Sequence, residues 1–473
     1  MNVFLVAFEF PPLASAGIHR ALKFSRYLPE FGIRPVVLTT DEPSFRQIVN
    51  KPIDLSLLEE IPDTVAVERI PCQTFHQPST RIRSWSRIFF SLVEPQAKFW
   101  KANLEKQLPR LVSIHNPAVV CVSVPPFGMG PLWVEICRRL RLPLVLDFRD
   151  AWSQWRISPY ASWAHYCLTV RLERRCLDGA SRVICSSDQI RSDLLRLHPT
   201  VAPEKLVTLT NGYDQRVDDF SIPDHPSEAP DSKYIIGYVG SFYYEPAARE
   251  AMMLPWWHKK PHRMIQYAPR REDWLYRSPF FFFRCVSRLI SARPELRHRL
   301  RIRLAGTVSD WIRKQVSEFG LEDIVEFLGY LDHDKSIKFQ SECHALLITS
   351  SKVVGGADYS IAGKTFEYFA ARRPIVAFVT EGSQKAILEK SGLALICDPD
   401  DTDSSAESLS NLMHGRVTMQ PNHEFLRSLH ARELSSHLSR VLHQAGSGGN
   451  SAAADAPVGQ PVFAVNSERN NVS

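Results

Sequence analysis

Short apolar runs recur throughout this chain, and each of them ends in a turn rich in glycine, proline or polar residues. Amphipathic segments with helical spacing lie between the runs, as Ile18–Phe31 does between Val3–Phe8 and Arg34–Thr40. Strand, helix and strand in this order are typical of a parallel sheet with helices on both faces. The pattern therefore predicts an α/β fold, whose ligands bind beyond the carboxyl ends of the strands. The other expected strands are Val119–Val124, Leu144–Asp147, Arg182–Ser186 and Leu206–Thr210, and then Tyr234–Val239, Leu300–Leu304, Ile324–Phe327, Ala345–Thr349, Ile375–Phe378 and Leu393–Cys397.

The strand–helix pattern occurs twice, so we expect two domains of the same class, and 473 residues suffice for two hydrophobic cores. The first domain occupies residues 1–217, and the Asp-, Ser- and Pro-rich stretch 218–233 is expected to be a linker. The second domain occupies residues 234–425 and contains a basic and aromatic insertion at 243–279. A terminal helix at 426–444 and a disordered tail at 445–473 are expected to follow.

Composition narrows the functional classes. The net charge of +6 favours anionic ligands or an anionic membrane surface, but it is too small to indicate a nucleic-acid partner. The nine cysteines are scattered and form no C-x-x-C pair, which predicts reduced thiols in a cytoplasmic protein and neither disulfides nor a zinc site. The start, MNVFLVAFEFPP, lacks a basic region, so we expect no signal peptide. No apolar run is long enough to predict a transmembrane helix.

Gly363-Lys364-Thr365 matches the last three residues of the P-loop motif, the phosphate-binding loop of ATP and GTP sites. A P-loop also needs a glycine five residues before the Gly-Lys pair, and Asp358 stands at that position. The motif instead predicts a loop that enters a helix, whose free N–H groups, together with Gly363 and Lys364, suit a diphosphate. Glu367 lies one turn further on, where it can accept hydrogen bonds from a ribose diol. The alternative is that Lys364 is solvated and that Glu367 only complements the helix dipole.

Several separated motifs occur in an order that resembles the retaining glycosyltransferases of the GT-B fold, specifically glycosyltransferase family four. The resemblance covers about residues 1–430 and rests on the motifs together, since each alone is unspecific. It implies two Rossmann-like domains that face each other across a cleft, with the nucleotide-sugar donor bound by the second. The motifs are Phe10-Pro11-Pro12 with Gly17 and Arg20, Leu28-Pro29-Glu30-Phe31-Gly32 before Pro35-Val36-Val37-Leu38-Thr39, Pro125-Pro126-Phe127, Asp147-Phe148-Arg149-Asp150-Ala151-Trp152, Asn211-Gly212-Tyr213-Asp214, Gly237-Tyr238-Val239-Gly240-Ser241 and Gly363-Lys364-Thr365-Phe366-Glu367-Tyr368.

By this resemblance, Glu367 matches the second glutamate of the family's E-x7-E motif and would bond the nucleotide ribose. Tyr359 stands in the place of the first glutamate, which contacts or positions the donor sugar. Asp358 beside it could serve instead, and a solvated loop aspartate is the alternative. Gly240 and Ser241 would cover the donor phosphates, together with the helix start at Gly363, Lys364 and Thr365.

The family usually supplies an arginine and a lysine shortly after the glycine–serine turn, where this chain has its insertion. Arg249, Lys259 and Lys260 could replace them, and the sequence does not choose among the three.

From the first domain, the loop from Pro11 to Gly17 would face the donor pyrophosphate, with Gly17 providing backbone freedom and Arg20 lying in the helical turn beyond. Arg149 and Asp150 end a strand where many relatives carry a His-Asp pair. We expect these two residues to be catalytic, in contact with the acceptor or the transition state. The alternative is a structural ion pair at the end of the strand.

No metal or other cofactor is expected, because the nucleotide sugar is a substrate and the resemblance implies no required metal. Asp332-His333-Asp334 and Asp398-Pro399-Asp400 have the D-x-D spelling found in metal-dependent transferases of another fold. Both triplets fall in expected turns, where aspartate is common because it forms local hydrogen bonds.

A membrane contact is indicated by Arg81–Trp100, where Trp85, Ile88, Phe89 and Leu92 share one helical face beside basic residues. This pattern suits an interfacial helix on anionic lipid, and the alternative is a core-facing helix with a solvated basic side. The tryptophan-rich insertion poses the same question, and a lipid-linked acceptor would explain both features.

The sequence therefore predicts a cytoplasmic retaining glycosyltransferase of the hexosyltransferase type, with peripheral contact at the inner face of the cell membrane. It would move a sugar from a nucleoside-diphosphate sugar to a glycan or lipid-linked acceptor, in polysaccharide or glycoconjugate biosynthesis, without a nucleic-acid partner. Two alternatives remain open. One is a nucleotide-sugar 2-epimerase of the same architecture, and the other is a non-catalytic nucleotide-sugar-binding relative, which the missing first glutamate favours.

Overall fold

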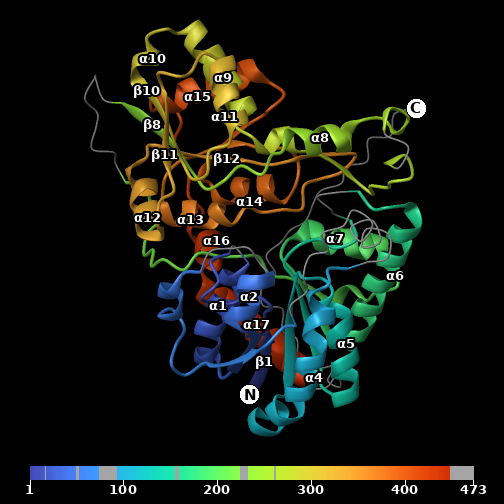
Figure 1. Ribbon diagram of the computed structural model, residues 1–473. Coiled ribbons are helices and arrows are strands. Elements are labelled where there is room, and N and C mark those ends of the chain that lie inside the picture. The colour runs from blue at the N-terminus through green and yellow to red at the C-terminus, as the bar shows by residue number, and fades with distance from the viewer. Residues whose placement is uncertain are drawn as a thin grey trace.

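Two α/β domains lie one above the other in the computed structural model, with the first domain below the second in Figure 1. The structure describes residues 1–15, 17–48, 53–73, 93–154, 159–223, 233–259 and 263–447. Each domain is built around a parallel sheet covered by helices, so the predicted class of two Rossmann-like domains is confirmed.

The sheet of the first domain has the strand order β3-β2-β1-β4-β5-β6-β7. Its strands are nearly continuous apolar runs because helices cover both faces, and every residue of β4 is buried. The strands are β1 (Asn2–Val6), β2 (Arg34–Thr40), β3 (Ala66–Ile70), β4 (Val119–Val124), β5 (Leu144–Phe148), β6 (Arg182–Cys185) and β7 (Leu206–Thr208). The helices are α1 (Ile18–Tyr27), α2 (Glu42–Ile48), α4 (Gln96–His115), α5 (Met129–Leu140), α6 (Trp163–Gly179) and α7 (Asp188–Leu197).

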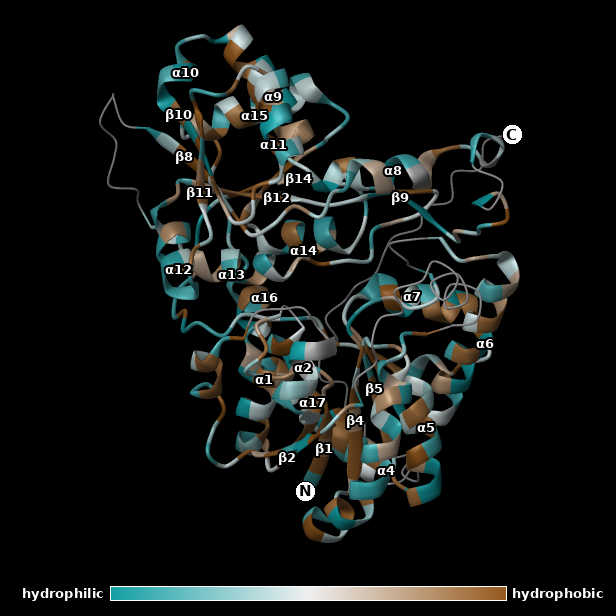
Figure 2. Ribbon diagram, viewed as in Figure 1, coloured by the Kyte–Doolittle hydropathy of each residue, from teal (hydrophilic) through white to brown (hydrophobic). Residues whose placement is uncertain are grey.

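The sheet of the second domain has the order β11-β10-β8-β12-β14-β15, and its first strand again lies near the centre. Figure 2 shows the same hydropathy pattern in both domains, with brown strands inside and teal faces of the helices outside. The strands are β8 (Tyr234–Val239), β10 (Leu300–Ala305), β11 (Val325–Gly329), β12 (Ala345–Thr349), β14 (Ile375–Phe378) and β15 (Ala394–Cys397). The helices are α8 (Pro246–Met253), α9 (Phe280–Ala292), α10 (Leu296–Arg299), α11 (Asp310–Glu318), α12 (His333–Glu342), α13 (Gly363–Ala371), α14 (Ser383–Ser391), α15 (Thr402–Met413), α16 (His423–Ser428) and α17 (Ala431–Gly446).

The last helix, α17, leaves the second domain and packs on the first, as the red helix beside β1 in Figure 1 shows. Its buried side chains, Leu434, Leu438 and Leu442 among them, join the same apolar cluster as Val3 and Leu5 of β1. The sequence predicted one terminal helix at 426–444. The structure instead has two helices, α16 and α17, with a turn at Leu429 between them. This turn contacts the first domain, where the Tyr213 N–H donates to the Leu429 carbonyl at 3.2 Å.

The insertion after β8 also crosses between the domains. Its strand β9 (Arg271–Asp273) pairs antiparallel with β13 (Lys352–Val354) of the second domain. Tyr267 forms an antiparallel bridge with Tyr160 of the first domain, with N–H to carbonyl distances of 2.7 and 3.1 Å. The expected insertion is thus a strap that joins the two domains as well as an excursion from the second.

Some expectations fall outside the described residues, which exclude 74–92, most of the expected linker (224–232) and the tail from residue 448 onward. The interfacial face of Trp85, Ile88, Phe89 and Leu92 is among them. Trp100, at the end of that segment, belongs to α4, is fully buried and donates its indole N–H to the Ile70 carbonyl at 2.9 Å. None of the described helices combines the length and the apolar character that crossing a bilayer requires.

Candidate functional site

The carboxyl edge of the second sheet gathers the residues of the Gly-Lys-Thr motif. Helix α13 begins at Gly363, and its N-cap residue Ala362 makes no side-chain capping bond. Among the described residues, the N–H groups of Gly363 and Lys364 have no hydrogen-bond partner, and a side chain placed on Gly363 would meet open space. A helix start with free, accessible N–H groups favours an anion.

Lys364 lies over the face of the Tyr238 ring, with its ammonium 3.7 Å from the ring centroid. Gly240 follows β8 with a φ of +103°, and a side chain there would approach the Lys364 ammonium to 3.1 Å. Burial lowers the pKa of Lys364 to about 7, although Glu367 acts in the opposite direction. Within the described residues Lys364 has no ion-pair partner, so an anion beside Gly240 would find an uncompensated cation.

Glu367 faces the first domain. Its carboxylate accepts a hydrogen bond from Gln340 at 3.4 Å, and it raises the pKa values of His19 and Lys23 on α1. Burial acts more strongly than Glu367, so the pKa values of His19 and Lys23 are both lowered overall. Glu367 is half-buried, and its effect on His19 and Lys23 shows that the start of α13 faces α1 of the first domain.

An apolar pocket adjoins this edge, at the ends of β8 and β10. Gly306, with a φ of +133°, allows the loop after β10 to pack directly on Gly240, and apolar side chains line this edge beside the anion site. The lining side chains include Tyr238, Phe242, Leu304, Ile312 and Phe327.

Thr365 has a structural role that the sequence did not show. Its hydroxyl is buried and exchanges hydrogen bonds with the amide of Gln384 on α14, at 3.0 and 3.2 Å. The same Gln384 oxygen accepts the Ala362 N–H at 2.8 Å. Gln384 therefore fixes the loop that leads into α13, because it bonds both Ala362 at the end of the loop and Thr365 in the first turn of the helix.

Arg20 is used entirely within the first domain. It forms a bidentate pair with Asp147 at 2.8 and 2.9 Å, and both side chains are 5% exposed. Its remaining N–H groups donate to the carbonyls of Leu209 and Thr210 and to the side chain of Asn211. All five guanidinium donors are therefore occupied by the chain itself. The expected contact of Arg20 with a pyrophosphate finds no free donor in this structure, and the residue instead ties α1 to the ends of β5 and β7.

Arg149 likewise joins loops of the first domain. It donates to the Gly17 carbonyl at 2.6 Å and to the Pro125 carbonyl at 2.5 Å, while its buried Nε finds no partner among the described residues. A side chain on Gly17 would collide with this guanidinium, so the glycine allows the close approach. Arg149 thereby fixes the loop that ends at Gly17 against the end of β4.

Asp150 forms a cluster with a residue of the second domain, Arg277. Burial raises the pKa of the Asp150 carboxyl, and the positive charges of Arg149 and Arg277 lower it in part. Burial alone would lower the pKa of Arg277, but Asp358, Glu272 and other groups, Asp150 among them, raise it above its usual value. Asp150 makes no hydrogen bond to any described residue. A carboxylate and a guanidinium from opposite domains thus interact electrostatically without forming a direct ion pair, and the guanidinium also binds Ser360 in the loop that precedes α13.

The Asp358–Tyr359 pair lies between the domains. Asp358 is fully buried, and its carboxylate accepts hydrogen bonds from both N–H and hydroxyl of Ser360, at 3.0 and 2.8 Å. Ser360 in turn accepts from Arg277 at 2.7 Å. Tyr359 is 3% exposed within the apolar cluster of the first domain, and its carbonyl accepts from Ser187 at 2.7 Å. Asp358 therefore stabilises its own loop, and Tyr359 anchors that loop to the other domain.

Of the expected site residues, the structure brings Gly240, Gly363, Lys364 and Glu367 together, and it places Asp150 and Arg149 at a second position, near Arg277. Ser241 follows Gly240 and is exposed.

The candidates within the insertion lie elsewhere. Arg249 is paired with Asp273 at 2.5 and 2.7 Å, Lys259 lies beside Arg263 and Arg271, and Lys260 is outside the described residues. Arg277, at the end of the insertion, was missed. The sequence feature that could have drawn attention to it is its position just before α9, where the insertion ends.

The D-x-D triplets have turn roles. Asp332 caps α12 by accepting the Lys335 N–H at 2.9 Å, and Asp398 accepts the Asp400 N–H at 2.8 Å. Across the ranges that the structure describes, no group of three or more His, Cys, Asp and Glu side chains could hold a metal ion.

Family models match both domains. A glycosyl transferase 4-like domain matches residues 17–212, and a model described as glycosyl transferases group 1 matches residues 281–415. The two segments together span more than half of the 473 residues. No curated protein matches the chain in sequence.

Solved structures share the fold at low sequence identity. HepE from Anabaena, in complex with UDP and glucose, is 13% identical with a TM-score of 0.50, covering 94% of this chain and 96% of its own. Sucrose-phosphate synthase from Thermosynechococcus elongatus is 12% identical with a TM-score of 0.54, over 94% and 96%. The lipopolysaccharide outer core galactosyltransferase WaaB, in its apo form, is 12% identical with a TM-score of 0.53, over 94% and 99%. At these identities the likeness shows a common two-domain architecture.

Proposed function

Because this chain belongs to the GT-B glycosyltransferases of the group 1 family, with a glycosyl transferase 4-like first domain, we propose that it transfers a sugar from a nucleoside-diphosphate sugar to a glycan or lipid-linked acceptor with retention of configuration. The observation that carries the proposal is the assembly at the carboxyl edge of the second sheet. There Lys364, the free N–H groups of α13 and the close-packed Gly240 offer an anion site, and Glu367 lies one turn away.

A nucleoside diphosphate fits this assembly group by group. Its phosphates would meet Gly363, Lys364 and Gly240, where the positive end of the helix offsets their charge without a metal. Glu367 would accept the ribose hydroxyls, and the apolar pocket that contains Tyr238 and Phe327 would receive the base. HepE is described in complex with UDP and glucose, which supports a uracil nucleotide as the first donor to test.

The chemistry of transfer develops positive charge at the anomeric carbon and negative charge on the departing diphosphate. Lys364 and the start of α13 would stabilise the leaving group electrostatically. The departing phosphate would itself take the acceptor proton, so no protein nucleophile is needed. On the acceptor side, Asp150 would receive a hydrogen bond from the incoming hydroxyl, and Arg277 would hold Asp150 ionised and oriented.

Replacing Glu367 with alanine should weaken nucleotide binding by about 1–3 kcal/mol, because the ribose hydroxyls lose a buried partner. Isothermal calorimetry measures the change, after a thermal-shift screen of sugar nucleotides has identified the base that stabilises the folded protein. Glu342→Ala, at the exposed end of α12, is the matched control and should leave affinity unchanged. Unchanged affinity in Glu367→Ala would remove the ribose role.

Nucleotide affinity should fall as the pH rises above 7. The pKa of Lys364 is lowered to about 7 in the free protein, and a bound diphosphate would raise it by favouring the ammonium. Below pH 7 the lysine is already charged, whereas above pH 7 binding requires proton uptake. Affinity then decreases by up to about tenfold per pH unit until the pH reaches the pKa of the complex.

Calorimetry in buffers of different ionisation enthalpy measures this proton uptake directly. Lys364→Met should bind nucleotide more weakly at neutral pH and should lack the proton uptake that comes from the lysine. Any proton uptake that remains in this variant comes from the phosphate or from other groups. Equal proton uptake by the wild type and Lys364→Met would contradict the assignment.

One observation favours a second candidate, a protein that binds a sugar nucleotide without transferring the sugar. Tyr359 occupies the place of the family's first glutamate, and it is buried against the first domain instead of facing the nucleotide site. Release of nucleoside diphosphate in the presence of acceptor would support transfer. Tight nucleotide binding with no release, over all donors and acceptors offered, would support the second candidate.

We also propose that the reaction takes place in the cytoplasm at the inner face of the membrane, in the synthesis of a polysaccharide or glycoconjugate. A lipid-linked acceptor would require the protein to approach a bilayer without spanning it. The basic and aromatic insertion supports this part of the proposal.

A further inference from the structure

Large exposed apolar side chains occur in the insertion and at the start of α6, the helix of the first domain that the insertion approaches. We call this group the junction surface, and it comprises Trp163 at the start of α6 and Trp257, Met264 and Ile265 of the insertion. These four side chains are 63%, 62%, 40% and 59% exposed. Exposed apolar groups that adjoin one another mark a contact with a partner, whereas single ones need no explanation.

The tyrosine bridge brings the insertion to the start of α6. Tyr160 and Tyr267 form one antiparallel bridge. Met264 and Ile265 lie three and two residues before Tyr267, and Trp163 lies three residues after Tyr160. The ring of Tyr166 on α6 packs on that of Tyr267 at 4.9 Å.

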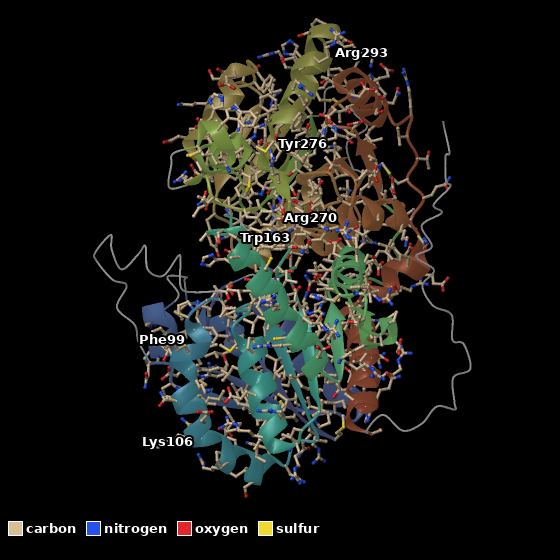
Figure 3. All side chains as sticks on the ribbon, turned by 90° about the vertical axis from the view of Figure 1, so that its right-hand side faces the viewer. Phe99, Lys106, Trp163, Arg270, Tyr276 and Arg293 are labelled. Atoms are coloured by element: carbon tan, nitrogen blue, oxygen red, sulfur yellow. The ribbon has the colours of Figure 1, made fainter. Side chains whose placement is uncertain are left out.

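An ion pair fixes the same region from the other side. Arg270 pairs with Asp193 of α7 at 2.5 Å, and the two side chains are 10% and 4% exposed. Figure 3 labels both Trp163 and Arg270 at the level where the two domains meet. The junction surface is therefore held on a rigid base that both domains share.

Positive charge borders the junction surface. Lys259 lies near Arg263 and Arg271, whose charges add to burial in lowering its pKa. Arg263 directly precedes Met264, and Arg271 begins β9, where it pairs with the exposed Val354 of β13. None of these three cations forms an ion pair with a residue in the described ranges. Apolar groups beside uncompensated cations match an anionic lipid interface.

We propose that the junction surface rests on an anionic lipid bilayer, with Trp163, Trp257 and Ile265 among the lipid headgroups and Lys259, Arg263 and Arg271 on the lipid phosphates. A second copy of the chain is a poorer occupant, because a two-fold contact would bring the same cations against each other. Aromatic side chains are favoured at the headgroup level, since one part of each ring is apolar and another polar.

The junction surface and the acceptor-side cluster both lie where the two domains meet, since Tyr160 bridges Tyr267 at the first and Asp150 interacts with Arg277 at the second. The use of the surface by a lipid-linked acceptor rests on the proposed function. The binding of the surface to lipid stands by itself and can be tested without any substrate.

Co-sedimentation with vesicles tests the proposal on the full-length protein. The vesicles contain either phosphatidylcholine alone or phosphatidylcholine and phosphatidylglycerol in equal parts. We expect binding to the anionic vesicles only, weakened by high salt because salt screens exposed charges. The double substitution Trp257→Ser with Ile265→Ser should reduce partitioning by at least about tenfold. Lys259→Glu should reduce it by about tenfold or more, since it removes one cation and adds an anion.

Ile114→Ser is the matched control, because Ile114 is 57% exposed at the far end of α4 and should not affect partitioning. Circular dichroism and nucleotide affinity check that the variants are folded. Equal partitioning by the wild type and both variants, or none by the wild type, would overturn the proposal. A dimer in light scattering that the double substitution abolishes would also overturn it and assign the surface to a second copy. Loss of nucleotide binding by the wild type with lipid binding intact would refute the proposed function alone.

Discussion

Replacing Arg20 with alanine is expected to lower the free energy of unfolding by about 3–5 kcal/mol, because it leaves the buried Asp147 carboxylate without its counter-charge. Both side chains are 5% exposed and joined by two hydrogen bonds. The substitution also releases the carbonyls of Leu209 and Thr210 from their shared donor. Urea unfolding followed by circular dichroism measures the loss, which should appear in the first of two transitions if the domains unfold separately.

The double substitution Arg20→Met with Asp147→Leu is the informative control. It removes both charges at once, and well-packed apolar side chains often replace a buried pair with little or no loss of stability. We therefore expect it to be considerably more stable than Arg20→Ala. If Arg20→Ala instead unfolded at the wild-type urea concentration and bound nucleotide much more weakly, Arg20 would be a ligand of the pyrophosphate, as its motif predicts, and its structural role would be minor.

For Arg20, the sequence predicted the position of the side chain but not its partners. The motif correctly indicated an arginine in the first turn of α1 at the carboxyl edge of the first sheet. The partners of that arginine come from β5 and from the segment after β7, which are far away in sequence, and no local pattern reveals that all its donors are taken. Spacing predicts which element carries a side chain, whereas the tertiary contacts decide whether its polar atoms remain free for a ligand.

All strands of the two parallel sheets except β3 were predictable because buried parallel strands are short apolar runs that end in turns. The edge strand β3 was missed because only its last residue is buried. The strap was not predictable, since its contacts depend on single residues. Tyr267 and Arg270 reach the first domain through one bridge and one ion pair, neither of which has a periodic signature. Arg277 was missed for a related reason: its partners Ser360, Asp358 and Asp150 are far away in sequence, and no local pattern connects them.

The sequence shows that Tyr359 replaces the first glutamate of the family motif, but it does not show what this tyrosine does. A tyrosine in place of a glutamate left open whether Asp358 would take over the role. In the structure the Asp358 carboxylate is committed to Ser360, and its neighbour Tyr359 is buried in the core of the other domain. Burial of this large aromatic ring attaches the loop before α13 to the first domain, so the position serves the contact between the domains.

Replacing Asp150 with asparagine is expected to lower the rate of sugar transfer by about 10²- to 10³-fold, the usual effect of removing one group positioned at a transition state. Asparagine keeps the size of the side chain but loses the negative charge that faces Arg277. Nucleotide affinity should change little, because the proposed function assigns Asp150 to the acceptor and the nucleotide to Lys364 and Glu367. Release of nucleoside diphosphate with saturating acceptor measures the rate, and calorimetry measures the affinity.

The pH dependence of transfer distinguishes a role of Asp150 in the reaction from a structural one. Burial raises the pKa of its carboxyl above the ordinary 3.8. As the pH is lowered, kcat should therefore begin to decline at a higher pH than it would if the aspartate were exposed. Asp150→Asn should lack this acid limb. Asp178→Asn, which alters an exposed ion pair with Arg174 on α6, is the matched control and should keep both the rate and the limb. An Asp150→Asn protein with the wild-type rate and pH profile would make the Arg149–Asp150 pair a structural ion pair at the end of β5, and the acceptor would then have to be bound by other residues.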